Sequence, residues 1–156
     1  IHQVAAETDV VDFIDLEYFE AKKPEKEIRI LQEMGVHVIA SHHDFEQTPE
    51  RGVIRMLLEQ IRESGADVVK LAVMPQSMQD VLDLLEETNA FHEKYPDKAL
   101  ITMSMGALGA ISRVSGEFFG SCVTFGAGEQ ASAPGQLPMG ELEQLLGTLH
   151  KSISRC

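Results

Sequence analysis

The chain has 156 residues, of which 44% are hydrophobic and 24% charged, and its formal net charge is −12 at pH 7. These values predict one folded domain over residues 1–156 and argue against a disordered chain. The negative charge also argues against binding to nucleic acid or to an anionic membrane, because both partners require a basic surface.

Strand-like and helix-like segments alternate along the chain. The patterns predict strands at 10–16, 36–41, within 65–76, at 99–104 and at 121–125, and helices at 24–34, 48–64, 77–94, 106–118 and 139–152. Gly35 is expected to end the first helix. Thr48 is expected to cap the second helix, with Pro49 in its first turn, and Ser77 to open the third.

Five strand-then-helix units indicate an α/β fold with a parallel sheet. Two architectures fit this order. A five-stranded doubly wound sheet would be complete at this length, whereas a (β/α)8 barrel of about 250 residues would lack about three units. Length favours the open sheet. The polar residues at the predicted strand ends favour the barrel.

Lys70 lies at the centre of an apolar run that is typical of a buried parallel strand. Side chains alternate along a strand, so Val68, Lys70 and Ala72 should share one face. A desolvated lysine can attack a carbonyl group and form an imine. The alternative is a lysine that reaches water at a strand end or pairs with Asp67 or a neighbouring acid.

Two histidines, His42 and His43, follow the second predicted strand. Adjacent residues rarely bind one metal ion, so a proton shuttle or a hydrogen-bonded structural histidine is the better interpretation. Lys70 follows His43 by 27 residues, one strand-helix unit later. We therefore expect the two side chains on neighbouring strands.

Three further polar residues follow the fourth and fifth predicted strands. Arg113 is either a surface residue or a clamp for a substrate carboxylate. The segment 131–136, with Ser132 and Gln136 as polar side chains, is either a lid over the site or a linker of low complexity.

Four motifs together resemble type I 3-dehydroquinate dehydratase of the shikimate pathway. They are Ser41-His42-His43-Asp44-Phe45 with Thr48-Pro49, Ala66-Asp67-Val68-Val69-Lys70 with Ala72-Val73-Met74-Pro75, Met103-Ser104-Met105-Gly106 with Ile111-Ser112-Arg113, and Ser132-Ala133-Pro134-Gly135-Gln136. The resemblance implies a (β/α)8 barrel in which Lys70 lies on the sixth strand. Strands four to eight would then be present and three N-terminal units missing.

The resemblance also implies the chemistry. Lys70 would form an imine with the C3 ketone of 3-dehydroquinate, and His43 would remove the C2 proton and help the C1 hydroxyl leave as water. Arg113 would bind the substrate carboxylate, with Ser132 and Gln136 as lid contacts. No metal or organic cofactor is expected, and His42 has no assigned role. The full-length form is expected to be a homodimer.

One residue that the resemblance implies is expected to be missing from this chain. Family members carry an acid that orients the histidine, and we expect no counterpart in this chain, because Glu17 is interpreted as a different position. An incomplete barrel should have two open sheet edges, so the chain alone should be weakly active or inactive. The alternatives are another imine-forming barrel enzyme of the aldolase type and an inactive barrel fragment.

Two cysteines, Cys122 and Cys156, are too few for a disulfide framework and suit a reducing cytosol. No stretch reaches the ~20 apolar residues of a membrane span. We therefore expect a cytoplasmic protein without a membrane partner.

Overall fold

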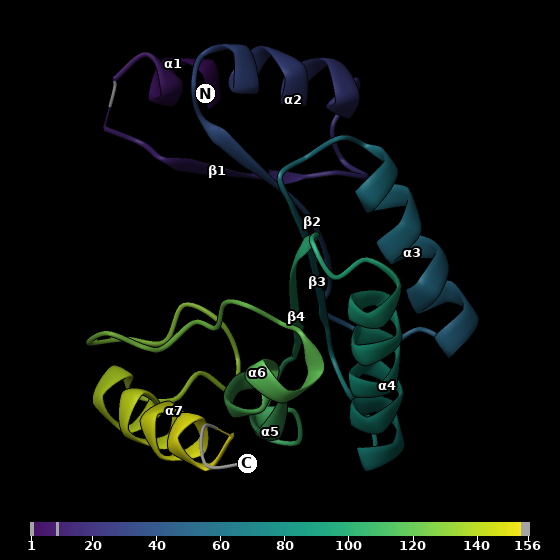
Figure 1. The fold of residues 1–156 in the computed structure, drawn as a ribbon, viewed down its shortest axis with the longest axis vertical. Coiled ribbons are helices and arrows are strands. Elements are labelled where there is room, and N and C mark those ends of the chain that lie inside the picture. The colour runs from purple at the N-terminus through teal and green to yellow at the C-terminus, as the bar shows by residue number, and fades with distance from the viewer. Residues whose placement is uncertain (1, 9, 154–156) are drawn as a thin grey trace.

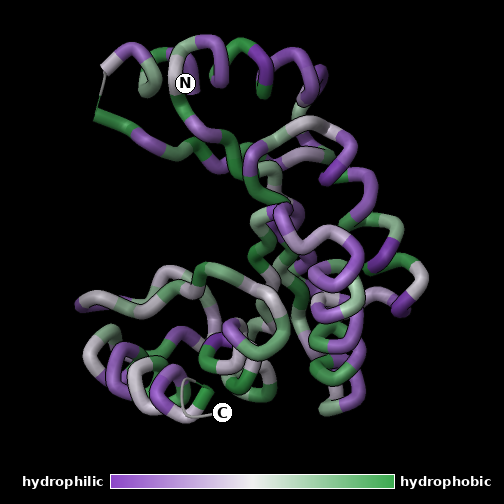
Figure 2. Tube along the Cα trace, in the orientation of Figure 1, coloured by the Kyte–Doolittle hydropathy of each residue, from purple (hydrophilic) through white to green (hydrophobic). Residues whose placement is uncertain are grey.

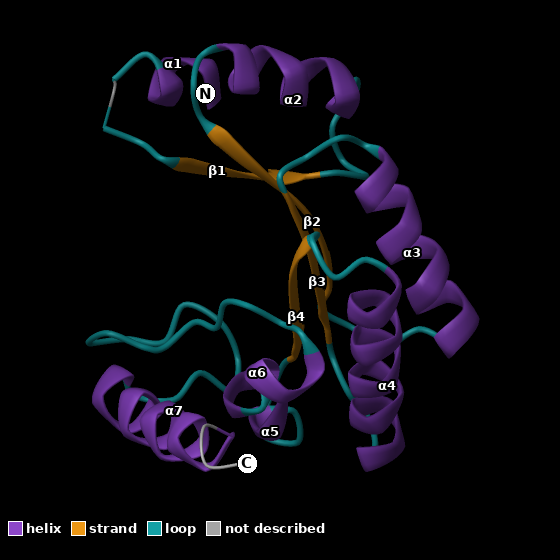
Figure 3. Ribbon diagram, in the orientation of Figure 1, coloured by secondary structure: helices purple, strands orange, loops and turns teal. Residues whose placement is uncertain are grey.

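The computed structural model describes residues 2–8 and 10–153 and shows an α/β fold (Figures 1 and 3). Cys156 lies outside the described residues. The elements are α1 His2–Ala6, β1 Phe13–Glu17, α2 Pro24–Glu33, β2 His37–Asp44, α3 Arg51–Glu63, β3 Val68–Val73, α4 Met78–Lys94, β4 Ala99–Ser104, α5 Ala110–Val114, α6 Gly116–Phe119 and α7 Met139–Ile153.

The four strands form one parallel sheet in the order β1-β2-β3-β4. Glu17, Ser41, Lys70 and Ile101 are register partners on successive strands. Parallel order with a helix after each of the first three strands is the arrangement that the alternating sequence pattern predicts. The sheet is therefore that of an α/β protein, with β1 and β4 at its two edges.

Helices α2, α3 and α4 cover one face of the sheet, which we call the outer face (Figure 1). The main hydrophobic core lies between them and includes Val69, Leu71 and Val73 of β3. Figure 2 shows the amphipathic character of these helices as alternating hydrophilic and hydrophobic residues. Burial of their apolar stripes holds them on the sheet.

The opposite face, which we call the inner face, carries Lys70. It has a smaller apolar cluster that includes Val68 and Ala72 of β3 and Ile101 of β4, with Phe125 packed against it. At its β1 edge, Phe13 is 52% exposed. The inner face is therefore only partly covered within the described residues.

The end of α2 and the start of α4 agree with the predictions, whereas the start of α3 does not. Gly35 has a φ of 85° just after α2, and Ser77 and Asp80 form a capping box at α4. Helix α3 begins at Arg51, not at Thr48. Glu50 is the N-cap residue, with a φ of −58° and a ψ of 149°, and the buried Thr48 hydroxyl has no hydrogen-bond partner among the described residues, so Thr48 does not cap the helix.

The predicted fifth strand at 121–125 is absent from the sheet. The segment runs beside β4 with one main-chain hydrogen bond, from the Cys122 N–H to the Leu100 carbonyl oxygen at 2.8 Å. The Ser121 hydroxyl accepts from the Thr102 N–H at 2.9 Å and also bonds its carbonyl oxygen at 3.3 Å. A side chain thus takes the backbone groups that a ladder would need.

The predicted helix at 106–118 consists of two short helices, α5 and α6, which meet at Ser115. The last helix, α7, agrees with the prediction within one residue at its end. Among residues 2–8 and 10–153, no helix has the length and apolar composition that crossing a membrane requires.

Candidate active site

Lys70 lies within β3 on the inner face and is 7% exposed. Its Nζ donates a hydrogen bond to Asp15 Oδ2 of β1 at 2.5 Å, and the Phe125 ring centroid lies 5.1 Å from Nζ. The lysine thus pairs with a neighbouring acid, but this acid is not Asp67. Asp67 accepts a hydrogen bond from the Val38 N–H at 2.8 Å.

His43 lies at the end of β2, where it contacts the last residue of β1. Its Nδ1 is 2.6 Å from Glu17 Oε2, and its ring stacks on Phe45 with centroids 5.7 Å apart. A carboxylate only accepts hydrogen bonds, so Nδ1 carries the proton and Nε2 of the neutral ring keeps its lone pair. Nε2 is therefore the ring nitrogen of His43 that is left to accept a proton.

The Glu17 carboxylate has further donors. It accepts from the His43 N–H at 3.2 Å, and its Oε1 is 3.0 Å from His42 Nδ1. Burial acts to raise the pKa of Glu17, but the hydrogen bonds from His43 and His42 outweigh it, so the pKa is lowered from 4.5. Glu17 is therefore an anion at neutral pH.

The lysine and the histidine share the inner face. His43 is the register partner of Ala72, two residues beyond Lys70. With strands ~4.8 Å apart and a rise of ~3.3 Å per residue, the Cα atoms of Lys70 and His43 lie about 8 Å apart. An amine and an imidazole at this separation can reach one small ketone from the same side.

Arg113 of α5 is 1% exposed, so it is not a surface residue. Its Nη2 donates to the Pro134 carbonyl oxygen at 2.8 Å, and its Nη1 lies 3.8 Å from Met103 Sδ on β4. Burial lowers the pKa of Arg113 from its usual value. Its Nε has no hydrogen-bond partner among the described residues, so this buried cation retains a donor for an anionic group.

The predicted lid is a loop between 127 and 138 whose two ends pair with each other. Ser132 and Gln136 bond one another, with the Ser132 N–H 2.7 Å from Gln136 Oε1. Gly135 adopts a φ of 75° and lies against Gly106, where an added Cβ would be 2.2 Å from the carbonyl oxygen. The loop is thus tied to Arg113 through Pro134, whereas Ser132 and Gln136 contact each other.

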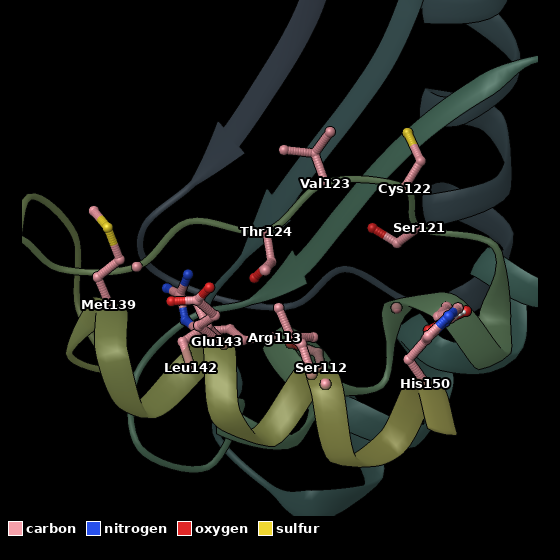
Figure 4. A pocket seen from close by; sticks show the side chains of 15 residues that line it. Ser112, Arg113, Ser121, Cys122, Val123, Thr124, Met139, Leu142, Glu143 and His150 are labelled. Atoms are coloured by element: carbon pink, nitrogen blue, oxygen red, sulfur yellow. Dashed lines mark hydrogen bonds and ion pairs between the residues drawn. The ribbon is translucent and has the colours of Figure 1, made fainter. Parts of the chain in front are cut away.

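A pocket of about 970 Å³ adjoins Arg113 (Figure 4). Its walls come from α5, α6, the segment 121–126 and α7, including Leu142 and Met139. Neither Lys70 nor His43 lines it. The pocket therefore includes Arg113 but neither the amine nor the imidazole, and Arg113 also contacts Met103 of the inner-face cluster.

The type I 3-dehydroquinase family profile matches residues 1–153. The chain belongs to this family. It is similar to the 3-dehydroquinate dehydratases of Bacillus licheniformis, at 45% identity over 98% of the chain, and of Bacillus subtilis, at 46% over 95%. It spans 61% and 58% of the length of these two relatives.

Solved structures of 3-dehydroquinase relatives have the same arrangement. The type I 3-dehydroquinate dehydratase of Clostridium difficile, described with covalently modified comenic acid, matches with a TM-score of 0.91 at 45% identity. That likeness covers 97% of this chain and 60% of the other. The enzyme of Geobacillus kaustophilus matches with a TM-score of 0.91 at 37% identity, over 96% and 58%.

The expectation that this 3-dehydroquinase chain lacks an acid beside the histidine is wrong, because Glu17 contacts His43 directly. Asp15, which pairs with Lys70, was also missed. The available signal was two acids two residues apart at the end of a predicted strand, which places both on one face. Only the register could reveal which cationic or imidazole groups they meet.

The residues that the structure describes contain no group of three or more His, Cys, Asp or Glu side chains able to hold a metal ion. His42, given no role from the sequence, contacts Glu17 and lies edge-on to the Phe19 ring, with centroids 5.0 Å apart. It therefore belongs to the same cluster as His43.

Proposed function

We propose that the protein is a lyase that dehydrates 3-dehydroquinate to 3-dehydroshikimate through a Schiff base on Lys70. The observation that carries this proposal is a buried amine on the same sheet face as an imidazole whose free nitrogen is Nε2. Membership of the type I 3-dehydroquinase family supports the same substrate and a role in the shikimate pathway.

The reaction begins at Lys70. The ammonium group first loses a proton, for which the contacting Asp15 carboxylate is an acceptor. The amine then attacks the C3 carbonyl carbon and water leaves, which forms an iminium ion that attracts electrons from the C2–H bond.

His43 carries out the elimination. Its Nε2 takes the C2 proton, and the electron pair moves toward the iminium nitrogen. His43 then returns a proton to the C1 hydroxyl, which leaves as water. Glu17 keeps the ring in the required tautomer and stabilises the imidazolium that forms. Hydrolysis of the imine releases 3-dehydroshikimate and the free lysine, without a metal or an organic cofactor.

Arg113 and the lid bind the substrate in this proposal. Arg113 is a buried cation whose Nε has no hydrogen-bond partner among the described residues, which suits a carboxylate. Ser132 and Gln136 lie on the loop whose Pro134 contacts Arg113, and their mutual hydrogen bonds would exchange for substrate hydroxyl groups on closure.

We also infer that the four strands and the segment 121–125 correspond to strands four to eight of a (β/α)8 barrel. The part of the relatives' length that this chain does not span would supply the remaining strands. The complete protein would be a cytoplasmic homodimer without a nucleic-acid or membrane partner. Light scattering on the complete protein measures the oligomer directly.

Borohydride reduction tests the proposal. The chain is incubated with 3-dehydroquinate and borohydride, and the adduct is located by mass spectrometry. We expect an adduct at Lys70, which K70A removes. Lys98 is the control amine, because burial lowers its pKa and it lies outside the cluster. K98A should retain the adduct. An adduct at Lys98 in place of Lys70 would contradict the proposal.

The same experiment separates the alternatives. An adduct from a phosphorylated sugar ketone but not from 3-dehydroquinate would favour an aldolase, which has no need of His43. A Lys70 whose reactivity depends on pH like that of an exposed lysine would favour an inactive fragment. Efficient turnover by this chain alone would show that the rest of the relatives' length is dispensable.

A further inference from the structure

His42 and His43 share one carboxylate. His42 Nδ1 lies 3.0 Å from Glu17 Oε1, and His43 Nδ1 lies 2.6 Å from Glu17 Oε2. Consecutive residues on a strand face opposite sides, so a common partner is unusual. The shared partner arises because Glu17 is the last residue of β1 and pairs with Ser41, whereas β2 continues beyond Ser41 through His42 and His43. The carboxylate therefore lies under both imidazoles.

The two oxygens of Glu17 have different donors. Oε1 accepts from His42 and from the His43 N–H, whereas Oε2 accepts from the His43 ring and lies 3.4 Å from the Ser41 hydroxyl. The bond to His43 Nδ1 is the shortest of these. A donor on Oε1 restrains rotation of the carboxylate, so Oε2 stays directed at His43.

We propose that His42 is a positioning residue that orients Glu17 and thereby fixes the tautomer and ring direction of His43. The importance of this role for elimination depends on the proposed function, in which His43 Nε2 removes the proton. The hydrogen-bond geometry itself does not depend on it. His42 would then belong to the machinery of the site, although it never touches the substrate.

Among the described residues, the other donors to Glu17 besides the His43 ring are the His43 N–H at 3.2 Å and the Ser41 hydroxyl at 3.4 Å, and the His42 contact at 3.0 Å is shorter than both. On β3, the register partners of His42 and His43 are Leu71 and Ala72, which carry no polar side-chain atoms. The rings of Phe19 and Phe45 contact His42 and His43 respectively, which limits ring motion but provides no strong hydrogen bond to Glu17. The nearest cation on β3, Lys70, is paired with Asp15.

Two substitutions separate the hydrogen bond from the ring. H42N places an amide N–H where Nδ1 stands but removes the ring. H42F keeps an aromatic ring against Phe19 but removes the donor. If His42 acts through its hydrogen bond to Glu17, H42N should behave like the parent chain and H42F should not. If the His42 ring acts only by packing against Phe19, H42F should behave like the parent chain and H42N should not.

The first measurement is the ¹⁵N spectrum of the His43 ring at about pH 8.5, where imidazole is neutral. We expect one tautomer, protonated at Nδ1, in the parent chain and in H42N. In H42F we expect the population of the other tautomer to rise about tenfold, as loss of one charge-assisted hydrogen bond implies. An unchanged His43 spectrum in H42F would overturn the proposal.

The second measurement uses the borohydride adduct on Lys70. Its mass shows whether the trapped cyclic keto acid has lost water. H42F should lower the dehydrated share of the adduct, and H42N should restore it. Equal shares in all three proteins would overturn the role of His42 in elimination. Absence of any adduct would instead count against the proposed function, and the ¹⁵N result would still decide the positioning role.

Discussion

The buried carboxylate of Glu87 offers a quantitative test of how the outer layer is held together. Glu87 of α4 is 1% exposed and lies against α3. It accepts from Arg51 Nε at 3.0 Å, and from Arg55 Nε and Nη2 at 3.0 and 2.8 Å. These two helices support β3 and β4 from the outer face, so the stability of the cluster matters for the strand that holds Lys70.

The substitution E87Q keeps the shape but removes the charge. A hydrogen bond to an ionised group contributes ~1.5–3 kcal/mol and a neutral one ~0.5–1.5 kcal/mol, which is a difference of about 1 kcal/mol per bond. The arginines are 41% and 62% exposed, so solvent screening reduces the sum. We expect E87Q to lower the free energy of unfolding by about 2 kcal/mol at pH 7.

The pH dependence has a definite sign. Burial acts to raise the pKa of Glu87, but the hydrogen bonds from Arg55 and Arg51 outweigh it, so the pKa lies below 4.5. The stabilisation is therefore fully present above pH 4.5 and is lost as the pH falls through the folded-state pKa. The difference in the free energy of unfolding between the parent chain and E87Q should therefore become smaller as the pH falls below 4.5.

Urea titrations of the parent chain, E87Q and E86Q between pH 3 and pH 7 test this reasoning. Glu86 is the matched control, since it also bonds Arg51, at 2.7 Å, but is 60% exposed. E86Q should change the free energy of unfolding by less than about 1 kcal/mol. An E87Q effect as small as that of E86Q, or one that does not change with pH, would refute the argument.

Three further substitutions test the site and the loops. E17Q replaces two acceptor oxygens by one acceptor and one donor, so one of the two histidine rings should lose its Nδ1 proton, which ¹⁵N spectra of His43 would report. G135A should increase hydrogen exchange across 127–138, because its Cβ would meet the Gly106 carbonyl oxygen, whereas G128A, with no atom within 4 Å, should not. S77A should lower the free energy of unfolding by about 1 kcal/mol in urea titrations, since the capping box at α4 is lost.

The sequence by itself determined most of the secondary structure and the placement of two candidate site residues, Lys70 and His43. An apolar run with one lysine predicted β3, and alternation placed Lys70 on the face opposite Leu71. The spacing to His43 predicted neighbouring strands, which the register confirms. These inferences succeeded because periodicity and strand-helix alternation are local properties of the chain.

Local pattern failed where a side chain competed with the backbone. The segment 121–125 has the composition of a strand, but the Ser121 hydroxyl bonds the Thr102 backbone in place of a ladder. Helix α3 starts two residues later than predicted, since Glu50 and not Thr48 is its N-cap. Arg113 was open to two interpretations, and only packing against Met103 and the lid decided that it is buried.

The tertiary structure alone decided the partners of the Lys70 amine and the His43 ring. Asp15 meets Lys70 across 55 residues, and Glu17 meets His43 across 26. No local pattern encodes these pairs, because they depend on which strand lies beside which and in what register. A shift of one residue in that register would move every one of these side chains to the other face of the sheet.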